Sequence, residues 1–367
     1  MTLLATPFHA RAVEANRFNA WENRGGFTLA TSYSRAEEEA VAARFGAVAA
    51  DISWRWRVQL TGPHVAEFVS RLFTKDAAGL AQGTALKALW LNDAGAVRGA
   101  GTVARIAEDS FLLVCTLEDA DWITGAARLF DVTIRDVTRV EGGLALVGPA
   151  VHRILSAAGI DAELPPMTFG RRIWRGLVVT LSRLGLGYEL WCDPDSALIV
   201  WERLMAAGRP YALRPAGQAA LDILEIESGV MHPGRDYQPA RDGFTPGPSP
   251  QSLGLTGLVD RAHVFNGRAG VLAAGADSSL AGVLLDGDTP VPNATLTHRG
   301  QAVGRTLSSR FSPAMRCAIA FAILDGPWPA SDLMAGSTPC RAAALPFLPI
   351  PAPIGATEHA PADVQQS

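Results

Sequence analysis

One acidic side chain stands out as a candidate for chemistry. Glu189 lies in an apolar stretch, residues 184–191, which reads LGLGYELW and is typical of a strand. Burying a carboxylate in such a setting costs several kcal/mol unless something binds it. A ligand with N–H donors, a nearby arginine, or a position on the outer face of a hairpin would each satisfy Glu189, and the residues alone leave these alternatives open.

A second candidate is the alternation of aromatic and cationic residues at positions 54–57. In a strand, Trp54 and Trp56 would lie on one face, and Arg55 and Arg57 on the other. This pattern fits an aromatic wall and a cationic face beside a substrate. It fits an edge strand with one packed and one solvated face slightly better, because alternation alone predicts that arrangement.

Three common catalytic signatures are absent or out of place. Residues 99–104 (GAGTVA) match a dinucleotide fingerprint, but that fingerprint needs a following helix, and residues 103–114 look like a β-hairpin. The seven histidines include no H-x-x-x-H pair and the four cysteines no C-x-x-C pair, so no metal site is predicted. No G-x-S-x-G nucleophile segment occurs.

Composition sets the broad class. The chain has 367 residues, of which 48% are hydrophobic and 19% charged, which predicts a globular protein of two or three domains. Its net charge of -4 gives no general attraction to nucleic acid or to an anionic membrane. No apolar run approaches the roughly 18–20 residues of a membrane helix. Without a signal-like segment in residues 1–21, and with four scattered cysteines, we expect reduced thiols in a cytoplasmic protein.

Periodicity and turn residues predict the elements that must position these side chains. A helix is expected at residues 33–45, with Ser34 as N-cap and Glu37 completing a capping box. Asp193 and Pro194 should begin another helix. Further helices are expected at 64–72, 150–158 and 219–226, strands at 58–60, 86–91, 101–106, 111–116 and 144–147, and a hairpin at 177–181 and 188–192. The Gly- and Pro-rich residues 242–250 suggest a loop or linker.

The pattern changes beyond about Val271. Short apolar strands at residues 281–285, 301–306, 318–323 and 341–345 alternate with turns, which predicts a small antiparallel barrel. Residues 351–367 are rich in Pro and Ala and are expected to fray.

Six short motifs follow one another in an order that resembles a known family. They are DIS at 51–53, TGP at 61–63, NDAGAV at 92–97, GYEL at 187–190, ESG at 227–229 and FSP at 311–313. This order resembles the glycine-cleavage T-protein (aminomethyltransferase) and the related tetrahydrofolate-dependent demethylases, and is closer to the dimethylsulfoniopropionate-demethylase-like branch. The resemblance runs from about residue 21 to residue 348.

The resemblance implies an α+β fold of three domains around a central folate channel, with a C-terminal antiparallel β-barrel. The expected bounds are 1–50 plus 140–240 for the first domain, 51–139 plus 241–270 for the second, 271–350 for the barrel and 351–367 for the tail.

The resemblance also implies site residues. Glu189 would bind the amino-pyrimidine edge of the tetrahydrofolate pterin, because a carboxylate matches that pair of donors. The T-protein has consecutive aspartates where this chain has Gly99 and Ala100, a tyrosine where it has Lys87, and an arginine where it has Glu225. The remaining assignments are Arg98 and Lys87 as catalytic cations, Tyr188, Glu227 and Thr116 with Glu189 as cofactor-binding residues, and Trp54, Arg55 and Trp56 as substrate-binding residues.

The expected function is methyl transfer from a small N-, O- or S-methylated substrate to tetrahydrofolate, with no nucleic-acid or membrane partner. One alternative is a folate-binding module without catalysis. Relatives of that kind which assist iron–sulfur assembly carry a cysteine in the segment equivalent to residues 230–237, where this chain has none. Another alternative is a subunit that has lost folate. Whether the chain works beside a dehydrogenase or another subunit stays open.

Overall fold

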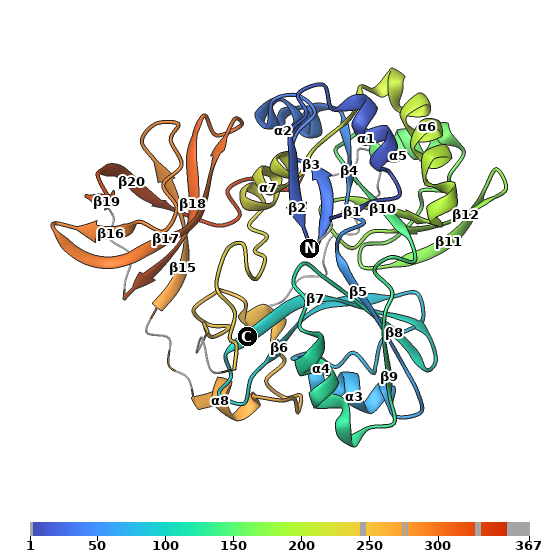
Figure 1. The fold of residues 1–367 in the computed structure, drawn as a ribbon. Helices are drawn as coiled ribbons and strands as arrows, with labels where there is room; N and C mark the ends of the chain where they lie inside the picture. Colours follow the sequence, from blue (N-terminus) through green and yellow to red (C-terminus); the bar gives the residue numbers. More distant parts are fainter. Residues whose placement is uncertain (1–2, 243–246, 274, 276–277, 327–331, 351–367) are drawn as a thin grey trace, which may run out of the picture.

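The computed structural model describes residues 3–242, 247–273, 275, 278–326 and 332–350, and its strands form three open sheets and one closed barrel (Figure 1). The chain begins with a small sheet in the order β1-β3-β2 beside helix α1. Its elements are β1 (Leu4–Ala5), α1 (His9–Ala15), β2 (Trp21–Arg24) and β3 (Phe27–Ala30). No described helix is long and apolar enough to cross a membrane.

The largest open sheet has six strands and is covered by helices on both faces. Its order is β11-β12-β13-β10-β4-β14. The strands are β4 (Ala47–Asp51), β10 (Gly142–Val147), β11 (Phe169–Trp174), β12 (Leu177–Ser182), β13 (Tyr188–Cys192) and β14 (Leu213–Pro215). The helices are α2 (Ala36–Phe45), α5 (Val151–Ala158), α6 (Ala197–Gly208) and α7 (Gln218–Glu227).

Strand β4 shows why both faces need covering. Ala47 and Ala49 pack in one core with side chains of α5 and α6, while Val48 and Ala50 pack in another with side chains of α2 and α7. Because successive side chains of a strand point to opposite faces, the continuously apolar β4 requires a helix layer on each side.

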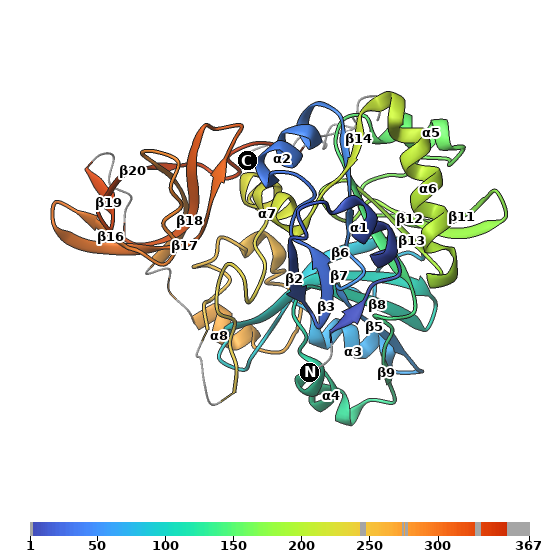
Figure 2. The ribbon, with the colours of Figure 1, turned by 45° about the horizontal axis from the view of Figure 1, so that its top comes forward.

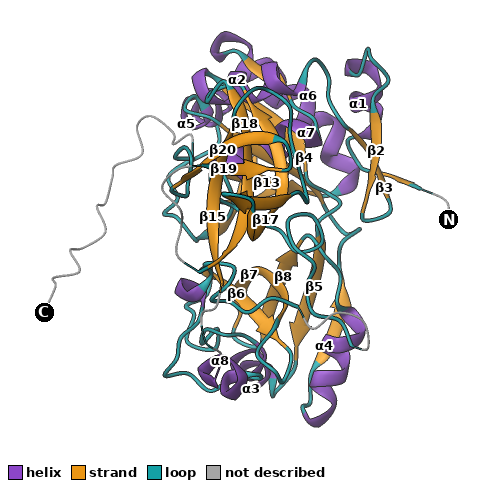
Figure 3. Cartoon of the chain, turned by 90° about the vertical axis from the view of Figure 1, so that its left-hand side faces the viewer, coloured by secondary structure: helices purple, strands orange, loops and turns teal. Residues whose placement is uncertain are grey.

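The second open sheet has five antiparallel strands in the order β6-β7-β8-β5-β9. Its strands are β5 (Trp56–Thr61), β6 (Ala85–Leu91), β7 (Val97–Ala107), β8 (Ser110–Cys115) and β9 (Thr133–Asp136). Helix α3 (Val65–Leu72) and helix α4 (Ala120–Ala126) share one apolar core with it. Figure 3 shows this sheet with α3 and α4 below the rest of the molecule.

The C-terminal strands close into a six-stranded barrel in the order β15-β18-β17-β16-β19-β20, which confirms the expected barrel. They are β15 (Ser278–Leu285), β16 (Thr295–His298), β17 (Gln301–Ser312), β18 (Cys317–Asp325), β19 (Leu333–Ala335) and β20 (Thr338–Ala343). The barrel contacts the rest of the molecule beside α7, where Ile226 packs against Leu307, Ile319 and Phe321 (Figure 2).

Several local predictions are confirmed. β12 and β13 pair antiparallel, as expected for the hairpin, and Asp193 accepts a hydrogen bond from the backbone N–H of Asp195 as a cap. Gly99 lies inside antiparallel strand β7, which leads into β8 rather than into a helix. The surroundings of Gly99 therefore exclude the dinucleotide fingerprint. The four cysteines are free thiols.

Other local predictions were wrong. Helix α2 begins at Ala36, and its N-cap residue Arg35 makes no side-chain capping hydrogen bond. Glu39, not Glu37, accepts hydrogen bonds from the backbone N–H groups of Tyr33 and Ser34, each at 2.6 Å. Glu39 lies two residues, or roughly half a turn, beyond Glu37, so its side chain leaves the helix on a different face. Strand β5 begins at Trp56, so Trp54 and Arg55 lie in a turn.

The boundary before the barrel also differs from the prediction. Val271 lies in helix α8 (Arg268–Ala273), and the first barrel strand begins at Ser278. The expected linker at 242–250 falls partly outside the described residues, at 243–246, and the expected tail at 351–367 lies wholly outside them.

Gly99 sits directly beneath an indole. It is paired with Trp90 across β6 and β7, and a Cβ added to Gly99 would lie 2.0 Å from Cζ2 of Trp90. Trp90 is held in place because its Nε1 donates to Asp119 at 2.9 Å and its ring meets the edge of Phe73. The space above Gly99 is therefore filled by protein.

We predict that Gly99→Ala lowers the free energy of unfolding by about 1–3 kcal/mol or more, because the buried indole must move. Gly125→Ala in α4 is the matched control, since a Cβ there meets nothing within 4 Å. It should change stability by less than about 1 kcal/mol, with a gain favoured. Urea denaturation of both variants measures this, and equal stabilities would contradict the close contact with Trp90.

Candidate functional site

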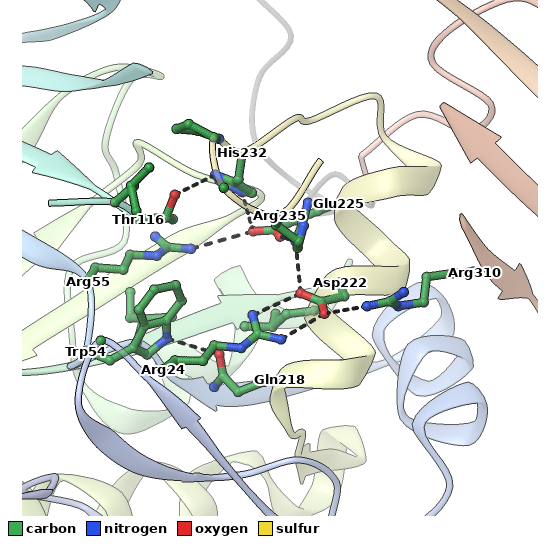
Figure 4. A pocket seen from close by; sticks show the side chains of 16 residues that line it. Arg24, Trp54, Arg55, Thr116, Gln218, Asp222, Glu225, His232, Arg235 and Arg310 are labelled. Carbon is green, nitrogen blue, oxygen red and sulfur yellow. Dashed lines mark hydrogen bonds and ion pairs between the residues drawn. The ribbon is translucent and has the colours of Figure 1, made fainter. Parts of the chain in front are cut away.

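Two adjoining cavities meet where the open sheets and helix α7 converge. We name the first, of about 390 Å³, the arginine cavity after Arg24, Arg55, Arg235 and Arg310, which line it (Figure 4). The second, of about 460 Å³, is the lysine cavity after Lys87. Both volumes fall in the range of small-molecule sites. Four residues line both cavities, namely Arg55, Thr116, Glu225 and His232.

The lysine cavity combines two carboxylates, those of Glu189 and Glu225, with one amine and apolar walls. Glu189 is buried on β13, and its Oε1 accepts a hydrogen bond from Nη1 of Arg55 at 2.6 Å. Its Oε2 has only long contacts, at 3.4 Å from Oγ of Ser182 and 3.4 Å from Nε1 of Trp191. A carboxylate oxygen has two lone pairs, so Glu189 retains capacity for further donors.

Lys87 is the amine of this cavity. Solvent reaches its side chain through the cavity, yet the surrounding protein atoms desolvate the amine and lower its pKa, with Glu189 opposing this shift and Arg55 adding to it. Among the described residues no hydrogen bond or ion pair is formed by the Lys87 amine. Lys87 can therefore meet a bound molecule directly.

The arginine cavity is organised around Asp222 of helix α7. Its carboxylate accepts hydrogen bonds from Nη1 and Nη2 of Arg24, at 2.9 and 2.8 Å, and from Nη1 of Arg235 at 2.8 Å. Arg310 of the barrel adds a contact at 3.3 Å. Burial raises the pKa of Asp222, but the bond from Arg24 and the charge of Arg235 outweigh it and hold the pKa below its ordinary value.

Glu225, one turn farther along α7, faces both cavities. Its Oε1 lies 3.0 Å from Nε2 of His232 and 3.8 Å from Nη2 of Arg55, and its Oε2 accepts from Arg235. Burial is the largest single effect and raises the pKa of Glu225, but His232, Arg235 and Arg55 together outweigh it, so the net pKa lies well below the ordinary value. Glu225 is therefore an ionised carboxylate in a buried position.

Five of the residues selected from the sequence lie in these cavities: Trp54, Arg55, Lys87, Thr116 and Glu189. Trp54 lines the arginine cavity, where its Nε1 donates to Oε1 of Gln218 at 3.0 Å and Arg24 lies over its ring. The structure thus brings an aromatic ring, a carboxylate and two cations to two adjoining cavities that share Arg55.

Four selected residues lie elsewhere. Arg98 pairs with Asp119 at 2.9 Å and lines a separate hollow. Trp56 is buried in the core under the five-stranded sheet. Tyr188 is buried in the core of the six-stranded sheet, and its hydroxyl donates to the carbonyl of Ala162.

Glu227 is the fourth residue outside the cavities. It is fully buried, accepts from Ser312 of the barrel at 2.5 Å and pairs with Arg44 of α2. It therefore joins α7 to two neighbouring parts of the molecule.

Sequence reasoning did not assign Asp222, Glu225, His232, Arg235 or Arg24 to the site. One signal was present, because Asp222 and Glu225 are spaced by three within the apolar segment 220–227 (ALDILEIE). Two carboxylates on one face of a largely buried helix require cations. Arg235 lies 13 residues from Asp222, whereas Arg24 lies 198 residues away, so the pairing with Arg24 could not be found in the sequence.

Comparisons with known proteins place this geometry in context. The family model of the GCVT N-terminal domain matches residues 8–248. An aminomethyltransferase of Frankia alni is 30% identical over 339 residues, covering 88% of this chain and 90% of that protein. A trimethylamine-oxide aldolase of Ruegeria pomeroyi is 29% identical over 324 residues, which cover 82% of this chain but 40% of that protein.

One solved structure matches the fold throughout. The glycine cleavage system aminomethyltransferase T from Bartonella henselae superposes with a TM-score of 0.82, covering 95% of this chain and 99% of that one. Its sequence identity is 23%, so this likeness concerns the fold alone. The α+β architecture with its C-terminal barrel is that of the T-protein, as expected.

The paired carboxylates of α7 predict a defined dependence of stability on pH. Because the folded pKa values of Asp222 and Glu225 are depressed, their contribution is complete above their ordinary pKa values, near 4. It is lost as the pH falls through the lower folded values. We predict a fall in the free energy of unfolding below about pH 4.5, approaching 1.4 kcal/mol per pH unit for each proton taken up.

Urea denaturation between pH 3 and pH 7 measures this dependence. Glu225→Gln should reduce the slope below pH 4.5, although it also lowers stability at pH 7 by leaving Arg235 one partner short. Glu14→Gln is the control, because Glu14 is an exposed partner of Arg11. If the three proteins have the same slope, the carboxylate network does not govern acid stability.

Proposed function

The chain belongs to the GCVT family, and on that premise we propose that it is a tetrahydrofolate-dependent methyltransferase. The reaction moves a methyl group from a small N-, O- or S-methylated substrate to tetrahydrofolate. The observation that carries this proposal is Glu189, a buried carboxylate with spare acceptor capacity on the wall of a mostly apolar cavity. Bound tetrahydrofolate would supply N5 as the nucleophile toward the methyl carbon.

The residues of the lysine cavity fit the pterin. Glu189 offers carboxylate oxygens to an amino-pyrimidine edge, which presents N–H donors. Leu184, Leu186 and Leu258 provide an apolar wall beside it. In this arrangement Glu189 sets the orientation of the ring, and the leucines keep water from it.

Arg55 and Lys87 are the cations that the cavity offers to a substrate or leaving group. Arg55 lines both cavities, while Lys87 lies in the lysine cavity alone. Preorganised cations of this kind stabilise negative charge that develops during a reaction. Arg98 forms ion pairs with Asp119 and Asp242. We therefore propose Arg55, in place of Arg98, as the arginine that stabilises negative charge during the reaction.

The cavity favours methyl transfer over aminomethyl transfer. Ala100 lines the lysine cavity and Gly99 lies beneath Trp90, so neither position supplies a carboxylate. N-methylated donors come first for testing, because one relative is named for its action on trimethylamine oxide. The chain covers 40% of that relative, so its whole activity is not carried over.

The alternative is a folate-binding module without catalysis. The loop after α7 argues for an enzyme, because it places His232 and Arg235 against cavity space instead of a cysteine. Ionisable side chains gathered at a cavity are typical of catalytic sites.

We predict that Glu189→Gln weakens tetrahydrofolate binding by about 1.5–3 kcal/mol, the scale of a charged hydrogen bond. Quenching of tryptophan fluorescence under anaerobic conditions measures the Kd. Glu163→Gln, at an exposed residue paired with His152, is the control and should leave the Kd unchanged. Equal affinities in all three proteins would remove Glu189 from the folate site.

The reaction class is tested by the product. With tetrahydrofolate and a panel of N-, O- and S-methylated compounds carrying ¹³C in the methyl group, we predict labelled 5-methyltetrahydrofolate by mass spectrometry. With the aminomethyl-lipoyl carrier of glycine cleavage we predict no 5,10-methylenetetrahydrofolate, because positions 99 and 100 carry no acid. Formation of that product from an aminomethyl donor would instead assign the chain to aminomethyl transfer.

A further inference from the structure

Three side chains from separate segments form a continuous polar chain where the two cavities meet (Figure 4). Thr116 follows strand β8, Glu225 lies on α7, and His232 lies in the loop after α7. The Thr116 hydroxyl is 3.4 Å from Nδ1 of His232, and Nε2 of the same ring is 3.0 Å from Oε1 of Glu225. This spatial order places an imidazole between a hydroxyl and a carboxylate. Such an arrangement is suited to moving protons.

The surroundings determine which nitrogen of His232 holds the proton. Nε2 is buried and lies 3.0 Å from Oε1 of Glu225 without forming a hydrogen bond to it. The negative charge of that carboxylate favours the hydrogen on Nε2 in the neutral ring. Nδ1 is then an acceptor, and the Thr116 hydroxyl is the donor that lies beside it. This tautomer leaves Nδ1 able to take a proton from the cavity side.

The ring is also held in position and remains accessible. The backbone N–H of His232 donates to Asp236 at 2.6 Å, and Pro233 follows directly. About one-fifth of its side chain is exposed, and it lines both cavities. Arg235 and Arg55 meet Glu225, which keeps that carboxylate charged opposite the ring.

We propose that Thr116, His232 and Glu225 form a proton relay between the lysine cavity and the arginine cavity, in place of the carboxylates that positions 99 and 100 lack. The inference rests on the proposed function, with folate in the lysine cavity and the methyl donor in the arginine cavity. His232 and Thr116 are the catalytic members, and Glu225 is a positioning residue that acts through His232.

For one class of methyl donor, the relay accounts for every proton that moves in the proposed reaction. The bond between the methyl carbon and the heteroatom X breaks and its electron pair stays on X, while the methyl carbon bonds to N5 of the folate. The Thr116 hydroxyl and Nδ1 of His232 would take up the proton that N5 releases, and Nδ1 would return one proton to X. One proton thus moves from N5 to X, with no oxidant or reductant.

The need for this proton distinguishes two classes of methyl donor by the charge of the leaving group. A neutral amine or ether leaves a heteroatom that must take up a proton, so it needs the relay. A sulfonium or quaternary ammonium donor leaves as a neutral molecule and needs no such proton. We therefore infer that the substrates are neutral N- or O-methyl compounds.

The first test needs no donor. Protein labelled with ¹⁵N-histidine is examined by two-bond ¹H–¹⁵N correlation NMR, with and without tetrahydrofolate, and His232→Gln assigns the signals. We expect His232 with its proton on Nε2 and a change in its signals when tetrahydrofolate binds. Normal folate binding with the proton on Nδ1, or with unchanged His232 signals, overturns the relay alone. Absence of folate binding overturns the proposed function as well.

The second test uses the donors found in the labelled-methyl screen. His232→Gln and Thr116→Val should slow methyl transfer by about a hundredfold or more, while the Kd for tetrahydrofolate rises by a much smaller factor. Thr116→Ser keeps the hydroxyl and should restore transfer, and His152→Gln at a surface ion pair is the matched control. Wild-type rates in His232→Gln, or a donor set made up of onium compounds, would overturn the relay.

Discussion

The structure depends on one electrostatic constraint, the burial of three carboxylates on helix α7. Asp222, Glu225 and Glu227 are each less than one-tenth exposed, and charges in such positions are costly unless they are paired and hydrogen-bonded. No cation lies on the same helix. The partners come from the rest of the chain: Arg24 of β2, Arg44 of α2, Arg55 before β5, Arg310 of β17, and His232 and Arg235 from the following loop.

This constraint joins stability to chemistry in a single set of residues. Arg24 and Arg310 bring the first hairpin and the barrel against the same carboxylate, and their side chains form the wall of the arginine cavity. Arg55 spans from Glu189 to Glu225 and so links the two cavities. Guanidinium groups suit this task because their planar fork satisfies more than one oxygen at a time.

Much of the fold could be predicted from the sequence, because strand alternation, turns and motif order are local signals. The position of Glu189 within a strand could be predicted for the same reason. Tyr188 could not be in the same site, since neighbouring residues of a strand face opposite sides, and here Glu189 faces the cavity while Tyr188 faces the core. The long-range part of the ion network was not predictable, because Arg310 and Arg24 are 88 and 198 residues from Asp222 and meet it through tertiary packing alone.

The indole of Trp90 above Gly99 has a consequence for how this sequence can evolve. An acid at position 99 would need the volume that the ring occupies, and the ring is fixed by Asp119, which in turn is bound by Arg98. Placing an acid at position 99 therefore requires position 90 to shrink as well, and that change by itself opens a void in the core. Substitutions at positions 90 and 99 are thus coupled, and this strand pair limits which single substitutions the sequence can accept.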